Sequence, residues 1–277
     1  MAHPVSVQIC TLNEAQNIEE CLEAVWTNDP AEVIVIDGGS TDGTVDIARS
    51  LGAHVLTPGR LGLGPSRQVG YRATDLPYSA FVDADDRLTP DWIATMLAEM
   101  EAGGYAALQS SLRTVDTGTF WSRGWNEYFI ESVRPTADTT MVGRPAMFLS
   151  SALQADDSTL SSLDEDTHLS RRFELKGLRQ GIGSAVAHRY VEETWRENTG
   201  KWRSYGRGYR GFVAEHPERR QALIQHMLVT IPLGRSWHPV LRGRLMQPAF
   251  AALMTASILA GWFQGPGTDQ TPKAASA

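Results

Sequence analysis

Three carboxylates follow a short apolar run in the stretch AFVDADD, which covers residues 80–86. Asp83, Asp85 and Asp86 carry like charges, so their closeness is unfavourable unless a cation lies among them. Carboxylate oxygens are hard ligands that suit Mg²⁺ and Mn²⁺, and Mg²⁺ usually combines one or two carboxylates with water and substrate phosphates. The spacing of Asp83 and Asp85 therefore favours a divalent-cation site, and a solvated acidic loop is the structural alternative.

A second polar cluster, IDGGSTDGT, contains Asp37 at the end of an apolar β-branched run. Gly38 and Gly39 allow the backbone to come close to a ligand. Asp42 and Thr44 are suited to capping the next helix, which is the alternative to a binding role for them. The segment is not a P-loop, because no Gly-Lys-Ser/Thr follows it.

Strand-like and helix-like segments alternate over the first hundred residues. The expected strands cover residues 5–10, 32–37, 53–56, 79–83 and 105–110, and the expected helices cover 17–26, 44–51, 65–74 and 89–101. This order predicts an α/β fold with a mostly parallel central sheet flanked by helices. Because ligands bind such sheets beyond the carboxyl ends of the strands, the clusters TLNE, DGGSTDGT and DADD should share one rim and form one site.

The composition is that of a globular protein. The chain has 277 residues, of which 42% are hydrophobic and 21% charged, enough for one large domain or one domain with an appendage. A net charge of −7 does not favour a nucleic-acid partner. Cys10 and Cys21 form neither a disulfide framework nor a zinc pattern, and the N-terminus enters a strand almost at once, so we expect a reduced, cytoplasmic setting without a signal peptide.

Five motifs carry a resemblance to a known family. They are TLNEAQNIEECLEAV, VIVIDGGSTDGT, GPSRQVGYRAT, FVDADD and DEDTHLSRR. In this order they resemble the family-2 glycosyltransferases, over Val5 to about Gly211. The resemblance implies a GT-A fold, an inverting hexosyltransferase type of activity, a nucleoside-diphosphate sugar donor, a hydroxyl acceptor that is lipid-linked or part of a cell-envelope glycan, and Mg²⁺ or Mn²⁺ as cofactor.

The resemblance also assigns donor-binding residues. Arg67 would approach the diphosphate, Asp83 would meet the ribose region, and Asp85 would bind the metal. Many members have a second aspartate that contacts the base where this chain has Gly38, so the base is left open. The expected donor-binding residues are Thr11, Asn13, Glu14, Asp37, Gly39, Arg67, Asp83, Arg203 and Arg207, and the expected metal ligands are Asp85, Asp83 and His188.

The stretch SLDEDTHL supplies the expected base. The resemblance assigns this role to Asp166, with Glu165 beside it, because the acceptor hydroxyl must lose its proton as it attacks the anomeric carbon. The alternative is a helix N-terminus, where acidic residues are favoured by the helix dipole. The expected mechanism is one in-line displacement with inversion, in which Asp166 deprotonates the acceptor.

Three basic residues are assigned with structural alternatives beside them. Arg203 and Arg207 could stabilise the leaving diphosphate, because guanidinium groups bind such charge bidentately, but a solvated basic helix face is an equal alternative. His188 could bind the metal or the diphosphate, and a structural role is the alternative.

The segment FWSRGWNEYF could form an acceptor-side wall. Trp121, Trp125 and Tyr128 could stack on sugar rings, with packing into the core as the alternative.

The C-terminal part changes character. We expect a glycosyltransferase domain over residues 1–218, with a donor half of about 1–110 and an acceptor half of about 111–218, then a helical extension over 219–264 and a disordered tail over 265–277. Residues 245–263 contain no charged residue and follow a basic stretch with Arg235, Arg242, Arg244, Trp237 and His238. This pattern predicts association with the anionic inner face of the membrane, in the interface rather than across it. Packing on the catalytic domain or in a homodimer is the alternative.

Two other functions are compatible with parts of the pattern. A nucleotidyltransferase would also use a metal and a nucleotide, but it would usually show a glycine-rich basic stretch near the N-terminus, which VQICTLNE lacks. A nucleotide-sugar-binding module without turnover would not need both DADD and DEDTH.

Overall fold

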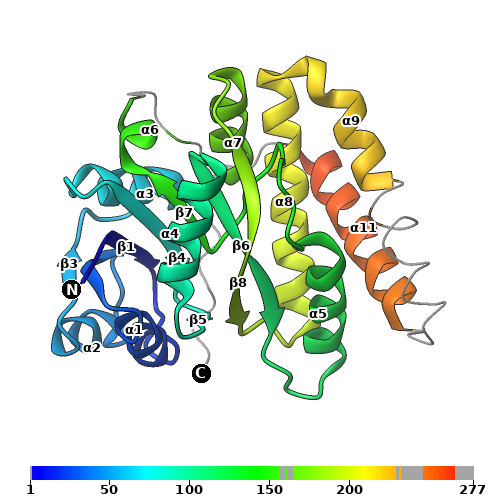
Figure 1. The fold of residues 1–277 in the computed structure, drawn as a ribbon. Coiled ribbons are helices and arrows are strands. Elements are labelled where there is room, and N and C mark those ends of the chain that lie inside the picture. The colour runs from blue at the N-terminus through cyan, green and yellow to red at the C-terminus, as the bar shows by residue number, and fades with distance from the viewer. Residues whose placement is uncertain (1, 156–159, 161–164, 229–230, 232–245, 266–277) are drawn as a thin grey trace. The chain divides into compact units, whose positions relative to one another are not determined.

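The computed structural model describes residues 2–155, 160, 165–228, 231 and 246–265. The chain forms two compact units (Figure 1). Within the described residues, the first contains those up to Arg113 and Val133–Arg189, and the second contains Thr114–Ser132 and those from Tyr190 to Gly265. The two units are described separately below.

The first half of the central sheet is parallel. Its strands are β3 (His54–Leu56), β2 (Pro30–Asp37), β1 (His3–Thr11) and β4 (Tyr78–Asp83), in that spatial order. The helices α1 (Ile18–Trp26), α2 (Thr44–Ser50) and α3 (Leu63–Arg72) connect them. All three strand pairs in this half are parallel, as the alternating sequence pattern predicts.

The second half of the sheet is antiparallel. The order continues from β4 through β7 (Ala146–Leu149), β6 (Ala107–Thr114) and β8 (Gln180–Arg189) to β5 (Asp86–Leu88). The pairs β4/β7, β6/β7 and β5/β8 run antiparallel. The remaining helices of this unit are α4 (Trp92–Gly103), α6 (Ser150–Gln154) and α7 (Glu165–Leu175). The expected α/β fold with a helix-flanked sheet is therefore present, and the sheet is mixed.

The core of the first unit follows from apolar patterning. Residues 33–36 of β2 are buried on both faces of the sheet, as expected of a continuous β-branched run. In α1, the buried residues Ile18, Cys21, Leu22 and Val25 recur at helical spacing, so one stripe of the helix covers the sheet.

The second unit is helical. It contains α5 (Phe120–Ser132), α8 (Trp195–Glu215), a 3₁₀ turn (Pro217–Arg219), α9 (Arg220–Gln225) and α11 (Met246–Gln264). A Cβ atom at Gly206 of α8 would clash with the backbone of α11, and one at Gly261 of α11 would clash with the backbone of α8. These two glycines let α8 and α11 approach closely, side by side as in Figure 1.

The apolar character of α11 is partly explained by this packing. Phe250, Met254 and Ile258 are buried, whereas Phe263 is 79% exposed. Within the described ranges, no helix combines the length and the apolarity needed to cross a membrane. The basic stretch with Arg235 to Arg244 and the tail from residue 266 lie outside the described residues.

Candidate active site

The ends of three parallel strands meet at one edge of the sheet. In the strand register, Thr11 of β1 lies beside Asp37 of β2, and Cys10 lies beside Asp83 of β4. The loops that follow these strands therefore start from a common rim, which is the arrangement that binds ligands in open α/β sheets.

Asp37 holds the rim together from inside. It is 2% exposed, and its carboxylate accepts hydrogen bonds from the Thr11 hydroxyl and the Ser40 hydroxyl on one oxygen and from the Gly39 and Ser40 amides on the other. Gly39 adopts a φ of +96°, which glycine reaches without strain. Asp37 thus fixes the glycine turn, and its contact with a nucleoside stays a prediction.

The TLNE loop is tied to the start of α2. The Glu14 amide donates to the Thr44 hydroxyl (2.8 Å), the Ala15 amide donates to Asp42 (3.1 Å), and the Thr41 amide donates to the Asn13 side chain (2.9 Å). Asp42 also accepts from the Thr44 amide, so it caps this turn as well. The two loops therefore form one rigid edge of the site.

These bonds predict a pH-dependent contribution of Asp42 to stability. Although partial burial opposes it, hydrogen bonds from Thr44 and Ala15 hold the pKa of Asp42 below its ordinary value of 3.8. A lowered pKa adds stability that is present above the ordinary value and is lost as the pH falls through the folded-state pKa. We expect wild type to exceed Asp42→Ala in unfolding free energy at pH 7, with the difference closing below about pH 4.

Urea unfolding at pH 7 and at pH 3 measures this difference. Asp42→Asn is the control, since it keeps an acceptor oxygen and cannot titrate. A gap between wild type and Asp42→Ala that is equal at both pH values would contradict the assignment.

The acidic stretch 83–86 forms a compact cluster. Carboxylate oxygens of Asp83, Asp85 and Asp86 lie within 4.8 Å of one another. Arg189 lies among them: its Nε and Nη2 donate to the two oxygens of Asp86 (2.7 and 2.8 Å), and Nη2 also donates to Asp83 (3.0 Å). Asp86 is fully buried, whereas Nε of Arg189 lies 3.7 Å from Oδ1 of Asp85. Asp85 is therefore the member of the cluster least committed to this guanidinium.

Arg67 connects the acidic cluster to the start of α7. It is 1% exposed, and it donates from Nη2 to Asp83 (2.6 Å) and from Nε to Glu165 (3.3 Å). Its Nη1 is buried and has no hydrogen-bond partner among the described residues. An unsatisfied buried guanidinium nitrogen is unfavourable, so this atom is suited to an oxygen of a bound ligand.

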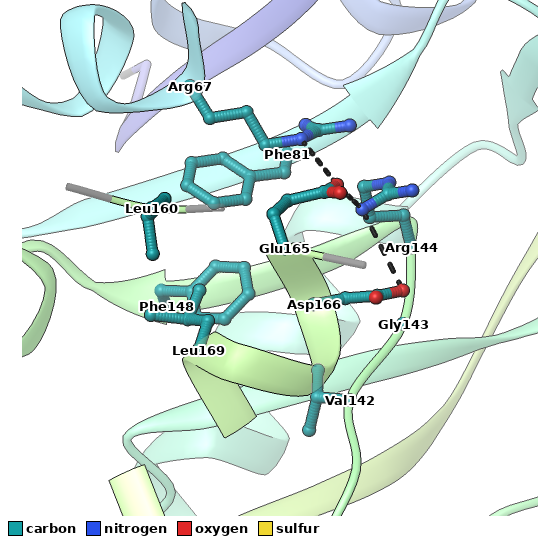
Figure 2. A pocket seen from close by; sticks show the side chains of 10 residues that line it. All are labelled: Arg67, Phe81, Val142, Gly143, Arg144, Phe148, Leu160, Glu165, Asp166 and Leu169. Atoms are coloured by element: carbon teal, nitrogen blue, oxygen red, sulfur yellow. Dashed lines mark hydrogen bonds and ion pairs between the residues drawn. The ribbon is translucent and has the colours of Figure 1, made fainter. Parts of the chain in front are cut away.

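Arg144 makes the second connection, and Figure 2 shows its contacts with Glu165 and Asp166 at the start of α7. Its Nε donates to Asp83 (3.2 Å), its Nη1 donates to Glu165, and Nη1 lies 3.8 Å from Asp166. Arg67, Arg144, Glu165 and Asp166 line a pocket whose apolar part is formed by Phe81, Val142, Phe148, Leu160 and Leu169. The pocket therefore combines charged and apolar lining residues.

Burial and the neighbouring arginines change the pKa values of the carboxyl groups in this network. Burial alone would raise the pKa of Asp83, but Arg144, Arg189 and Arg67 hold it well below the ordinary range. Burial raises the pKa of Glu165 despite Arg144 and Arg67, and burial also raises the pKa of Asp86 despite Arg189. Asp83 is therefore the carboxylate most firmly held in its ionised form.

The donor atoms of the cluster fit a divalent cation. Asp83, Asp85, Asp86, Glu165 and Asp166 supply five carboxylates to three guanidiniums, which leaves two negative charges in excess when all are ionised. Oxygen ligands and this excess suit Mg²⁺ or Mn²⁺. Since both oxygens of Asp86 and both oxygens of Asp83 already accept from arginines, Asp85 is the ligand that fits best, and a metal contact of Asp83 stays a prediction.

The remaining predicted residues lie elsewhere. His188 pairs with Arg87 across β5 and β8, whereas its neighbour Arg189 pairs with Asp86. Because successive strand residues point to opposite faces, His188 points away from the acidic cluster, and the described cluster of ligand atoms does not contain it. The assignment of His188 to the metal stays a prediction without support from this geometry.

Arg203 and Arg207 lie on α8 in the second unit. The Arg203 backbone packs against Gly261, and Arg207 donates to Gln264 at 3.5 Å. Trp125 is buried and donates from Nε1 to Asn198 (2.7 Å), so it is a core residue of this unit. Trp121 packs against Trp195, which is 56% exposed.

Two arginines of the site belong to no recognised motif, and the sequence analysis did not predict them. Arg144 stands in VGRPAMF before β7, and Arg189 ends β8 in AHRY. The one sequence feature that pointed to them was the cluster of carboxylates at 83–86, because like charges held close together need cations beside them. The nearest cations in the structure are guanidiniums of this chain.

Comparisons with known proteins agree with this fold. The model of the family "Glycosyl transferase family 2" matches residues 6–155, more than half of the chain. An uncharacterized glycosyltransferase of Mycobacterium tuberculosis, Rv0539, is 34% identical over 119 residues, which cover 42% of this chain and 52% of that protein. The match thus spans about half the length of this curated relative.

Solved structures show the same architecture. The mannosyltransferase PcManGT of Pyrobaculum calidifontis, in complex with GDP-Man and Mn²⁺, aligns with a TM-score of 0.62 at 20% identity, covering 94% of this chain and 76% of that chain. S. aureus TarS 1-349 in complex with UDP-GlcNAc aligns with a TM-score of 0.57 at 15% identity, covering 94% and 92%. At these identities the likeness concerns the fold.

Proposed function

We propose, from the premise that this chain belongs to glycosyl transferase family 2, that it transfers a sugar with inversion from a nucleoside-diphosphate sugar to a hydroxyl acceptor. The observation that carries the proposal is the meeting of the 83–86 cluster with Glu165 and Asp166 through Arg67 and Arg144 at the rim of the sheet. PcManGT and TarS, which share the fold, are described with bound nucleotide-sugars.

On the donor side, the loops at residues 11–14 and 37–44 are fixed to each other and suit the nucleoside. Asp85 and Asp83 would hold Mg²⁺ or Mn²⁺. When bound, this cation would neutralise part of the negative charge of the diphosphate. Arg67 presents its unpaired Nη1 to a phosphate oxygen of the donor.

On the acceptor side, Asp166 is the base. Its side chain lines the pocket and is 22% exposed, whereas that of Glu165 is 5% exposed and pairs with two guanidiniums. A base must reach the proton that it removes, so the more open carboxylate suits this role. Glu165 then holds the two arginines in place.

A panel of nucleotide-sugars with Mn²⁺ tests the donor class. We expect one donor to raise the melting temperature above the value with Mn²⁺ alone, because a ligand that binds only the folded state stabilises it. Failure of every UDP-, GDP- and dTDP-sugar to do so would contradict the proposed donor class.

We also propose a weak contact with the cytoplasmic face of the membrane, where a lipid-linked or cell-envelope acceptor would be available. The exposed ring of Phe263 supports this proposal, as do Arg207 and Arg210, which donate to Gln264 and Trp262 at the same end of α11. Aromatic and basic groups together suit an anionic interface.

Flotation on vesicles containing anionic lipid tests the membrane contact. We expect wild type to float at low salt, and Phe263→Ser to bind about tenfold more weakly, because burial of a Phe ring contributes about 1.5–3 kcal/mol. Leu175→Ser is the matched control, since Leu175 is 64% exposed in the first unit. Wild type that stays in the soluble fraction at low salt would contradict the contact.

A further inference from the structure

Arg144 occupies the centre of the charge network. Its guanidinium contacts Asp83 on the donor side and Glu165 on the acceptor side, and it lies 3.8 Å from Asp166. Burial opposes its charge, yet Glu165, Asp83 and Asp166 raise the pKa of Arg144 well above its ordinary value. Arg144 therefore stays positively charged, and its planar guanidinium can contact several carboxylates at once.

The segment that carries Arg144 is fixed on both sides. The Gly143 amide donates to the buried Gln109 side chain of β6 (2.7 Å), and the Val142 amide donates to the Ser170 hydroxyl of α7 (2.9 Å). Ser170 belongs to the same helix as Glu165 and Asp166. The segment that carries Arg144 is thus hydrogen-bonded to the same helix that carries the acidic pair.

Loss of Arg144 would affect its carboxylate partners to different degrees. Asp83 would keep Arg67 and Arg189 if Arg144 were lost. Among the described residues, Glu165 would keep one ion pair, the 3.3 Å contact with Arg67, and Asp166 would lose the one it has. Loss of Arg144 should therefore disturb the acidic pair far more than the donor-side cluster.

We propose that Arg144 is a positioning residue, which holds the start of α7 in place so that Asp166 meets the acceptor at the correct distance from the donor. The proposal rests on the proposed function for its kinetic consequence. Its structural consequence, the ordering of α7, stands independently of any activity.

Kinetics and binding of Arg144→Met form the first test. We expect kcat to fall by about 10²-fold, the effect of displacing a reacting group by about 1 Å. Binding of a nucleoside diphosphate with Mn²⁺, measured by calorimetry, should be nearly unchanged because Asp83 keeps two arginines. Arg171→Met is the matched control, since Arg171 lies on α7, pairs with Glu174 and does not line the pocket.

Arg144→Lys covers the case in which the Met variant does not fold. Lysine keeps the charge beside Glu165 but cannot donate from two separate nitrogens to Asp83 and Glu165. We expect a folded protein whose kcat is still reduced by at least about tenfold. Wild-type kcat in this variant, or an equal loss of turnover and nucleotide affinity, would overturn the positioning role.

Hydrogen exchange gives a readout that needs no substrate. In Arg144→Met or Arg144→Lys, the amides of α7 from Leu169 onward, which have partners within the helix, should exchange about tenfold faster, while those of β1 and β2 stay as in wild type. Unchanged exchange in α7 of a folded variant overturns the proposal even if turnover falls. Absence of transfer by wild type, with faster exchange in the variant, would instead contradict the proposed function and leave the positioning role supported.

Discussion

Replacing Asp166 by asparagine is expected to reduce turnover by roughly 10²–10⁴-fold, the usual contribution of a general base. Asparagine keeps the size of the side chain and an acceptor oxygen for the Thr167 amide, which donates to Asp166 at 2.9 Å. It cannot take the proton of the acceptor hydroxyl. Steady-state rates of transfer, with donor affinity measured separately, test this expectation.

Donor affinity should stay close to that of wild type, because the contacts of Asp166 within the described part of the chain are with Arg144 and the Thr167 amide rather than with the 83–86 cluster. Glu165→Gln is the informative companion, since Glu165 pairs with Arg67 and Arg144 and its loss should lower stability as well as turnover. If Asp166→Asn retains turnover within a few-fold of wild type, the base lies elsewhere, and Glu165 is the next candidate.

Replacing Asp85 by alanine is expected to abolish metal-dependent binding of a nucleoside diphosphate. The Asp85 side chain is 27% exposed and 3.7 Å from Arg189, so its loss should change the unfolding free energy little. The excess negative charge that suits a divalent cation would also fall by one. Calorimetric titration of nucleoside diphosphate with Mn²⁺ measures the effect.

Asp138→Ala is the matched control for Asp85→Ala, because Asp138 forms an exposed ion pair with Arg179 away from the cluster. It should bind nucleotide like wild type. Wild-type affinity in Asp85→Ala would remove Asp85 from the metal site.

The parallel half of the fold was predictable from sequence because apolar strand segments alternate with helical segments, and one strand carries a continuous β-branched run. This is the run at 33–36 in β2. The antiparallel half was not predictable, since β7 pairs with β4, and β6 pairs with β7, between segments far apart in the sequence. The sequence of β6 contains no signal that distinguishes a parallel from an antiparallel neighbour.

The rim of the site was predictable for a similar reason. Asp37 and Asp83 end strands whose register follows from their burial, so their approach is a consequence of the sheet. Arg144 and Arg189 were not predictable, because an arginine side chain is long and its partners depend on the packing of distant elements. Trp125 shows the same limit: its burial against Asn198 depends on α8, not on its own segment.

Release of nucleoside diphosphate from the stabilising donor, with Mn²⁺ and without acceptor, is the most direct test of the proposed transfer. We expect slow release by wild type and release reduced to background in Asp85→Ala, while Asp138→Ala matches wild type. Tight donor binding by wild type without any release would contradict the claim, and it would identify the chain as a binding module that keeps the fold without turnover.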